Sequence, residues 1–184
     1  MCIRDRHRAI SKGEYISKKV EQTISPSMDI QLASNFERLL FEIYKKNGAK
    51  LSDTFSSFPA KSIDFNQSDE IWQEVKAFFQ SSTCDDKEIV ETIVKSFETE
   101  NILFDPHTAT AIKGNKDLNL DPSELVTFAT AHPAKFTDAI EKAIPEYNAF
   151  IPAKVEIAFK QDEQFSILED NYYEIKKFIL TNAL

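Results

Sequence analysis

The sequence predicts an α/β fold that is rich in helices and contains a few short, mainly parallel strands. Two observations indicate this fold class. Several segments carry apolar residues at helical spacing after capping residues, and one apolar run, "ELVTFATA" at 124–131, is continuous, which is typical of a parallel strand buried on both faces. A chain of 184 residues, of which 42% are hydrophobic, is long enough for one domain with a core.

The first helix is predicted from a capping pattern. Ser34 and Glu37 have the spacing of a capping box, and the apolar residues that follow lie on one helical face. We expect a helix at about 35–47 that ends at Gly48, because glycine readily adopts the left-handed conformation that terminates helices. The segment 49–67 shows no sustained period and is predicted to be a loop.

Two further helices follow this loop. The stretch "DEIWQEVKAFFQ" at 69–80 places its apolar residues on one face and predicts an amphipathic helix. The next helix begins with Asp85 and Glu88, again in capping-box spacing, and its acidic first turn suits the helix dipole. Upstream of all these helices, residues 15–24 are predicted to be extended or irregular.

The stretch "NILFDPHTATAIKG" combines a short strand with a helix. Residues 102–104 have the apolar character of a strand. Asp105 can cap the helix that follows, Pro106 suits its first position, and Gly114 can end it. A polar turn at 115–124 then leads to the apolar run.

The stretch "ATAHPAKF" predicts a strand that passes through a tight turn into a helix. The strand is expected at 125–131, and the helix from Pro133 to about Ile144. Ligands bind beyond the carboxyl ends of strands in open α/β sheets, so this junction is a candidate binding site. An edge strand at 155–159 and an amphipathic helix at about 168–179 complete the prediction.

The composition argues against several classes of function. The net charge is −8, so nucleic acids and anionic membranes are poor partners, and no apolar run approaches the roughly 18–20 residues of a membrane span. The two cysteines, Cys2 and Cys84, are too few for a disulfide framework or a zinc site, which favours a cytoplasmic location. Gly13, Gly48 and Gly114 lie far apart, so the chain builds no glycine-rich phosphate cradle.

Few residues stand out as candidates for chemistry. His107 and His132 each neighbour a proline at a junction between elements, where an imidazole commonly serves as a hydrogen-bonding residue, and no third ligand at paired spacing supports a metal site. We interpret Cys84 as a structural thiol and Lys135 as a solvated lysine in the first turn of a helix. On composition alone, Thr130 is an ordinary β-branched strand residue.

Three stretches together resemble the C-terminal part of the threonine synthase family. They are "SPSMDIQLASNFERLLFE" at 25–42, "DPHTATA" at 105–111 and "TAHPAKF" at 130–136. The resemblance extends over about 7–184 and is loose over 144–184. It implies a fold type II pyridoxal-phosphate enzyme with a tryptophan-synthase-β-like fold, a lyase that converts O-phospho-L-homoserine and water to L-threonine and phosphate. That reaction is the last step of threonine biosynthesis.

The resemblance also implies roles for individual residues. The threonine of the "TAHP" motif, Thr130, binds the cofactor through a hydrogen bond at the pyridine nitrogen. Ser25, Asp29, Asn35 and His132 are expected near the substrate cleft, without individual catalytic roles. No catalytic residue is assigned within the chain, because the family's Schiff-base lysine and glycine-rich phosphate loop lie in the upstream half.

We therefore expect a truncated enzyme that is inactive by itself. Residues 1–6 are interpreted as a leader foreign to the protein and unpacked, 7–144 as the C-terminal portion of the catalytic domain, and 145–184 as a tail with an edge strand and a helix. The alternative is a stand-alone module whose acidic helices dock a partner protein. An upstream reading frame with a lysine in a Phe-Lys-Asp context and a Gly-Asn-Phe-Gly loop would favour the enzyme.

Overall fold

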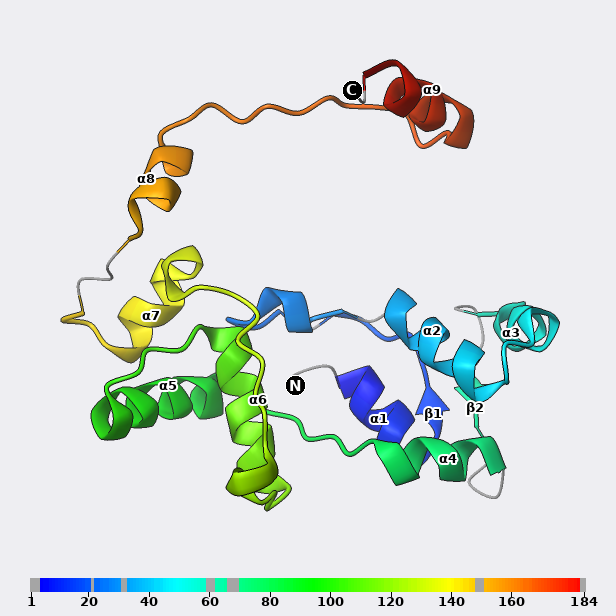
Figure 1. Cartoon of the computed structure of the whole chain (residues 1–184), viewed down its shortest axis with the longest axis horizontal. Helices are drawn as coiled ribbons and strands as arrows, with labels where there is room; N and C mark the ends of the chain where they lie inside the picture. The colour runs from blue at the N-terminus through cyan, green and yellow to red at the C-terminus, as the bar shows by residue number, and fades with distance from the viewer. Residues whose placement is uncertain are drawn as a thin grey trace. The chain divides into compact units, whose positions relative to one another are not determined.

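The computed structural model of this chain describes residues 4–20, 22–30, 33–58, 62–65, 70–147 and 151–182. The chain divides into two compact units, Met1–Phe150 and Ile151–Leu184. The first unit carries all three motifs of the resemblance (Figure 1).

The first unit is helical with one pair of very short strands (Figure 1). In chain order its elements are α1 (Arg4–Lys12), β1 (Glu14–Tyr15), η1 (Pro26–Met28), α2 (Ser34–Ile43), α3 (Gly48–Phe55), β2 (Ile63–Asp64), α4 (Glu70–Phe78), α5 (Asp86–Glu100), α6 (Pro106–Asp117), η2 (Pro122–Glu124), η3 (Pro133–Lys135) and α7 (Thr137–Ala143). The three η elements are single turns of 3-10 helix, and each begins with a proline, whose fixed φ suits the first helical position.

An aromatic cluster holds the elements from α1 to α4 together. Its centre is Tyr15 of β1, whose ring stacks on that of Phe58 with centroids 4.8 Å apart and packs against Phe36 at 5.0 Å. The Tyr15 hydroxyl accepts a hydrogen bond of 2.9 Å from the backbone of Ala33, immediately before α2. The buried members also include Ala9, Ile10, Leu40, Ile63, Phe65, Trp72 and Val75. These apolar contacts stabilise the N-terminal half of the unit.

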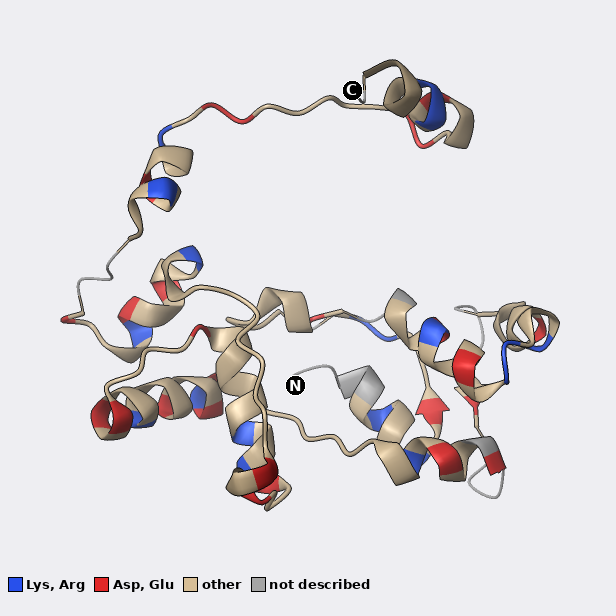
Figure 2. Ribbon diagram, in the orientation of Figure 1, with Lys and Arg blue, Asp and Glu red and all other residues tan. Residues whose placement is uncertain are grey.

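A second hydrophobic cluster lies between α5, α6 and α7. Ile89 and Ile93 of α5 are fully buried and pack with Ala109 of α6 and Ile140 of α7. The expected capping box starts α5: the Asp85 side chain accepts from the backbone of Glu88, and the Glu88 side chain accepts from the backbone of Asp85. Acidic and basic residues are interspersed along the exposed side of this helix (Figure 2). This cluster is the support on which the candidate site is built.

The first predicted helix differs at both ends from its expectation. The helix α2 begins at Ser34, and its N-cap residue is Ala33 rather than the expected Ser34. It ends at Ile43, because Lys45 and Lys46 adopt left-handed conformations with φ of 53° and 63°. The expected helix to residue 47 was therefore too long.

The predicted loop at 49–67 was also partly wrong. Gly48 does not end a helix but begins α3, whose N-cap Asn47 accepts a hydrogen bond of 3.0 Å from the backbone of Lys50. The strand β2 also falls in this range. The side-chain cap at Asn47 stabilises the start of this helix, although residues 49–67 show no sustained helical period.

The main difference between the sequence prediction and the structure concerns the strands. Within the described residues, β1 and β2 form the only ladder, an antiparallel pair that joins Glu14 to Asp64 and Tyr15 to Ile63. Segments 102–104 and 125–131 are irregular, and no parallel pair forms. A strand exists only where a neighbouring strand satisfies its backbone hydrogen-bonding groups. The described part of this chain supplies no such neighbour for either segment.

Two other predicted elements changed. The helix α6 continues past Gly114 to Asp117, and the helix expected from Pro133 to Ile144 is split into η3 and α7 by a break at Phe136. Of the expected leader, residues 1–3 lie outside the described residues, and residues 4–6 form the first turn of α1. Its foreign origin stays a prediction.

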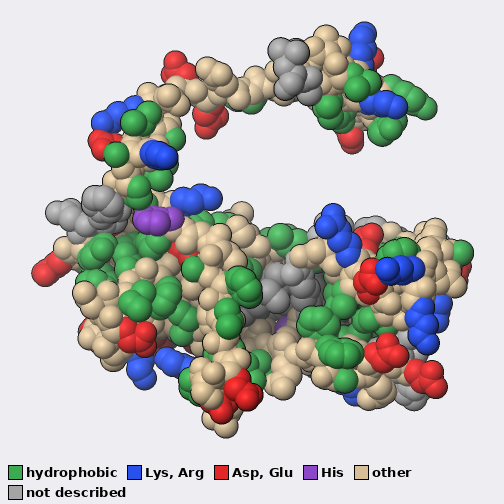
Figure 3. Space-filling view, viewed as in Figure 1, with side chains coloured by type: hydrophobic (Ala, Val, Ile, Leu, Met, Phe, Trp, Pro, Cys, Tyr) green, Lys and Arg blue, Asp and Glu red, His purple; other side chains and the backbone are tan. Residues whose placement is uncertain are grey.

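The second unit contains α8 (Ala153–Phe159) and α9 (Tyr172–Asn182), joined by an irregular segment. The edge strand expected at 155–159 is wrong, since these residues form α8; without a sheet to join, their backbone groups are satisfied by local helical hydrogen bonds. The final helix is confirmed, beginning four residues later than the start of the predicted range. Within this unit no described residue is buried, and hydrophobic side chains lie on its surface (Figure 3).

Candidate functional site

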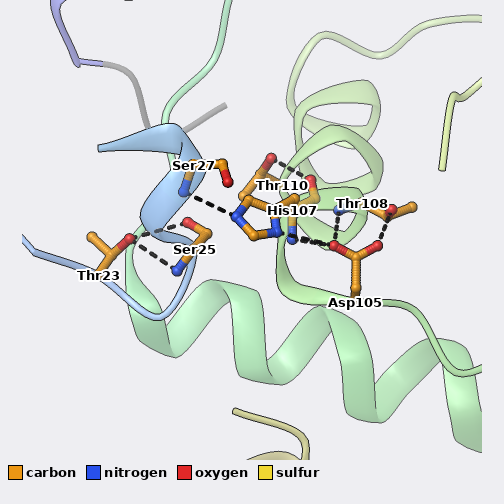
Figure 4. A network of polar contacts seen from close by, with 7 residues as sticks. All are labelled: Thr23, Ser25, Ser27, Asp105, His107, Thr108 and Thr110. Carbon is orange, nitrogen blue, oxygen red and sulfur yellow. Dashed lines mark hydrogen bonds and ion pairs between the residues drawn. The ribbon is translucent and has the colours of Figure 1, made fainter. Parts of the chain in front are cut away.

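The three motifs of the resemblance meet at the start of α6. The backbone amide of Ser27, in the first motif, donates a hydrogen bond of 3.1 Å to Nε2 of His107, in the second (Figure 4). The His107 ring in turn lies against the ring of Phe136, in the third motif, with centroids 4.5 Å apart. One buried histidine therefore joins segments that are far apart in the sequence.

Asp105 caps α6 as the sequence predicted, with Pro106 at the first helical position. Its carboxylate is only 1% exposed and accepts hydrogen bonds from the backbone amides of His107 and Thr108 at 2.9 and 3.3 Å. The Thr108 hydroxyl donates to the other carboxylate oxygen. A buried carboxylate is stable only when such donors replace water, and the positive end of the helix dipole adds to this effect.

The hydrogen bonds of His107 indicate its tautomer. Nε2 faces the Ser27 amide and must accept, so the ring proton resides on Nδ1. Nδ1 lies 3.2 Å from Oδ1 of Asp105 and donates to it. The His107 side chain is only 2% exposed in this arrangement. The pair is thus a neutral imidazole oriented by a carboxylate, rather than an ion pair.

The turn that presents Ser27 is held by its own side chains. Thr23 donates to Asp29 through its backbone amide at 2.7 Å and through its hydroxyl at 2.8 Å. Because the only hydroxyl proton of Thr23 is used in this bond, the Ser25 hydroxyl must donate to Thr23, at 3.0 Å. The backbone amide of Ile24 donates to Asp86 at the start of α5, at 3.1 Å. The turn is therefore fixed to α5 as well as to α6.

The sequence-predicted site residues are only partly brought together. Ser25 is fully buried, and with Asp29 it stabilises the turn. Asn35 is exposed in the first turn of α2, outside this network. Thr130 is exposed in the irregular segment after η2, and no hydrogen bond of its hydroxyl is found within the described part of the chain.

A pocket of about 340 Å³ lies beside the third motif. His132 lines it and accepts a hydrogen bond of 3.1 Å at Nδ1 from the backbone of Ala134, so it caps η3 as a hydrogen-bonding residue, as the sequence predicted. Thr130 lies between two lining residues, Ala129 and Ala131. The other lining residues are Leu103, Phe104, Asp105, Pro133 and Tyr147.

A second pocket of about 330 Å³ lies between the first and third motifs. Ile24 and Pro26 form one side of it, and residues 135–139 form the other. His107 contacts one lining residue of each pocket, because it bonds to Asp105 of the first and packs on Phe136 of the second. The same buried ring is therefore linked to the lining of both pockets.

Sequence reasoning missed three members of this network. Thr23 and Ser27 were not singled out, and neither was Thr108, although its position three residues after Asp105 is the usual one for a side chain that completes a cap. Thr23 carried no such local signal. Its role depends on a turn that closes on Asp29, six positions later, and the contact of Ser27 spans 80 positions.

A separate charged cluster anchors the far half of α6. The Nζ atom of Lys113 lies 3.0 Å from Oε1 of Glu88 and 2.5 Å from Oδ2 of Asp117. Burial lowers the Lys113 pKa, but hydrogen bonds with Asp117 and Glu88 outweigh it and hold the pKa above its ordinary value. Burial likewise raises the pKa of the Asp117 carboxyl, but hydrogen bonds from Lys113 and Ser82 leave it below its ordinary value. The cluster ties α6 to α5.

Comparison with known proteins matches this chain to one family. Residues 108–179 match the family model described as threonine synthase, C-terminal. The threonine synthase of Pseudomonas aeruginosa is 33% identical over 174 residues, which cover 94% of this chain and 37% of that protein. The threonine synthase of Saccharomyces cerevisiae is 32% identical, over 78% of this chain and 31% of that protein.

Two solved structures resemble the fold. A PLP-bound threonine synthase from Brucella melitensis superposes with a TM-score of 0.76 and 30% identity, over 95% of this chain and 37% of that structure. The yeast threonine synthase superposes with a TM-score of 0.74 and 26% identity, over 98% of this chain and 40% of that structure.

The fold is thus similar to part of an enzyme whose solved structure contains bound PLP. In sequence and in fold, the chain is similar to the C-terminal part of threonine synthases, as the three motifs predicted. It spans between 31% and 40% of the length of the relatives and structures named above. No helix of the described residues is long and apolar enough to cross a membrane.

Proposed function

We propose that this chain is the C-terminal portion of a pyridoxal-phosphate-dependent threonine synthase. The whole enzyme converts O-phospho-L-homoserine and water to L-threonine and phosphate in the cytoplasm, as the last step of threonine biosynthesis. One observation carries the proposal: the three motifs that define the resemblance converge around His107 and contribute lining residues to two pockets. Such convergence is expected of a binding site and is not required of scaffolding.

The described residues fit one side of the cofactor. Thr130 is exposed beside the 340 Å³ pocket and has no hydrogen-bond partner within the described part of the chain, so its hydroxyl is free to bond the pyridine nitrogen. The cofactor, when bound, acts as an electron sink for chemistry at the substrate. A neutral hydroxyl does not hold the ring nitrogen protonated as a carboxylate would, so the ring withdraws electrons less strongly. A weaker electron sink suits elimination and replacement better than transamination.

The phosphate side of the cofactor is not provided by these residues. The three glycines, Gly13, Gly48 and Gly114, are far apart in the sequence, so no glycine-rich cradle is built here. The lysine that binds the cofactor covalently is also assigned to the upstream part of the enzyme. We therefore propose that the isolated chain makes no threonine.

The proposed organisation follows from these assignments. Residues 7–144 contribute to the cofactor-binding domain, and 145–184 form a C-terminal tail. The proposed boundary lies close to the division between Phe150 and Ile151. Segments 102–104 and 125–131 would gain strand neighbours from the upstream part, which explains why they are irregular in this chain.

The test is production of threonine and phosphate from O-phosphohomoserine by the full-length protein in the presence of pyridoxal phosphate. We expect turnover by the full-length protein and none by the 184-residue chain at the same concentration. A full-length protein that binds the cofactor but releases no threonine would contradict the proposal. Absence of both cofactor binding and turnover would favour the alternative, an acidic helical module that docks a partner protein.

An experiment on the isolated chain tests independently whether the cofactor-binding lysine lies in the upstream half. Titration of the purified chain with pyridoxal phosphate should give no saturable change in cofactor absorbance and no borohydride-trapped adduct at a single lysine. A trapped adduct at one lysine would show that the chain holds a cofactor-binding lysine of its own, with Lys135 as the first residue to examine.

A further inference from the structure

His107 makes a contact that helix capping does not require. The backbone amides of His107 and Thr108 at the start of α6 already donate to the Asp105 carboxylate, which also accepts from the Thr108 hydroxyl. His107 nevertheless uses its second ring nitrogen to accept from the amide of Ser27. The side chain is nearly fully buried, so this contact accounts for its remaining hydrogen-bonding capacity.

The same ring controls the position of two walls. Through Ser27 it holds the turn whose residues Ile24 and Pro26 form one side of the second pocket. The His107 ring also makes a T-shaped contact with that of Phe136, another residue that lines that pocket. His107, whose orientation is fixed by Asp105, therefore links the turn to a second lining segment of this pocket.

We propose that His107 is a positioning residue of the substrate cleft, with Asp105 as the group that fixes its tautomer. Its imidazole locks the turn at 23–29 against α6, so that the cleft wall is formed before substrate arrives. This proposal rests on the proposed function only for the identity of the substrate, O-phosphohomoserine. His107 itself need not touch the substrate or the cofactor.

A preformed wall affects binding more than chemistry. If the turn must be ordered when substrate binds, part of the binding energy is used for that ordering, and KM rises. The steps after binding use groups outside this turn, including Thr130 and the upstream lysine, so kcat should change little. The cofactor absorbance spectrum should also stay unchanged.

Two amide substitutions separate the two hydrogen bonds of the ring. In His107→Gln the amide oxygen can reach the place of Nε2 and accept from Ser27, whereas in His107→Asn the shorter amide reaches only the place of Nδ1 and bonds Asp105. If the bond to Ser27 carries the effect, the glutamine variant is rescued and the asparagine variant is not. A role in packing or capping alone would not favour glutamine over asparagine.

The first measurement is hydrogen exchange in the 184-residue chain, which needs neither cofactor nor activity. We expect residues 22–30 to exchange about tenfold faster in His107→Asn than in the wild type, with α5 unchanged, and nearly wild-type exchange in His107→Gln. Unchanged exchange at 22–30 in His107→Asn would overturn the proposal. So would equal acceleration in both variants, or loss of protection in α5 as well.

The second measurement is steady-state kinetics of the full-length enzyme. His107→Asn should raise KM for O-phosphohomoserine at least about fivefold with kcat within about twofold of the wild type, and His107→Gln should restore KM. A fall in kcat without a change in KM would overturn the positioning role. If the wild-type enzyme makes no threonine, the proposed function fails, while the exchange experiment still decides the role of His107.

Discussion

The backbone amide of Ser27 lies 3.1 Å from Nε2 of His107, a hydrogen bond between residues 80 positions apart. It joins a 3-10 turn near the N-terminus to the first turn of α6. The bond requires a neutral imidazole with its proton on Nδ1, and the carboxylate of Asp105 supplies the acceptor that favours this tautomer. The stability of the turn and the cap of α6 are therefore coupled through one ring.

Replacing Asp105 should destabilise the chain in a graded way. Asp105→Ala removes the side-chain acceptor of the His107 and Thr108 amides and leaves the Nδ1 proton of His107 unpaired in a buried site. We expect it to lower the free energy of unfolding by about 2–4 kcal/mol. Asp105→Asn keeps one oxygen acceptor and should cost about 1–2 kcal/mol. Urea unfolding measures both, and equal losses would show that the carboxylate is not specifically required.

Substitutions of Thr130 test its proposed contact with the cofactor in the full-length enzyme. Thr130→Ser keeps a hydroxyl and should retain most activity, whereas Thr130→Ala leaves the ring nitrogen unpaired at a cost of roughly 1–3 kcal/mol. Thr130→Asp should be more harmful to the native reaction, because a carboxylate holds the ring nitrogen protonated and opens side reactions. Threonine formation and the cofactor spectrum are the readouts. If threonine formation and the cofactor spectrum are unchanged in the alanine and aspartate variants, Thr130 makes no functional contact with the cofactor.

Gly13 and Gly48 form a matched pair for backbone strain. Gly13 has φ of +75°, and a Cβ there would lie 2.6 Å from the carbonyl oxygen of Phe65. Gly13→Ala should therefore lower the free energy of unfolding by about 1–3 kcal/mol. Gly48 begins α3, where a Cβ would meet nothing closer than a Phe41 ring carbon at 3.9 Å. Gly48→Ala should raise stability by about 0.5–1 kcal/mol, and the opposite signs can be measured by thermal unfolding.

The cluster at Lys113 should contribute stability over a defined range of pH. The folded pKa of Asp117 is lowered, so its contribution is present above its unfolded pKa and is lost as pH falls through the lower folded value. The folded pKa of Lys113 is raised, so its contribution is lost only as pH rises through that higher value.

Lys113→Met should therefore be less stable than the wild type between about pH 5 and pH 9. Solvent screening limits the difference to about 1 kcal/mol or less, since the partner carboxylates are partly exposed. The difference should shrink below about pH 4 and above about pH 10.5. Unfolding free energies at several pH values measure it, and a difference that persists unchanged to pH 2 would contradict the assigned pairing.

The isolated chain should bind a hydrophobic dye. Val126 and Phe128, in the segment predicted to be a buried strand, are 76% and 78% exposed, and exposed apolar clusters promote dye binding and aggregation. Phe128→Ser should reduce dye fluorescence without lowering the free energy of unfolding. As a control, Phe36→Ser removes a buried ring and should destabilise the chain by about 3 kcal/mol or more. A monodisperse wild-type chain without dye binding would indicate that this surface is covered.

The sequence alone determined those features that depend on neighbouring residues. The capping box of Asp85 and Glu88, the cap of α6 by Asp105, and the hydrogen bond of His132 to its own 3-10 turn are all local, so residue type and spacing predict them. The family resemblance was also predicted from short motifs, and the comparison with known proteins confirmed it. Each of these features involves atoms within a few positions of the residue that reveals it.

Only the tertiary structure decided which of these pieces meet. The strand expected at 125–131 is irregular here because a strand requires a neighbour, and no local pattern specifies where that neighbour comes from. The end of α2 was misplaced because two lysines adopt left-handed conformations that their residue type does not favour. The pairing of Ser27 with His107 arises from the packing of distant segments, which lowers the free energy only once α5, α6 and the turn are assembled.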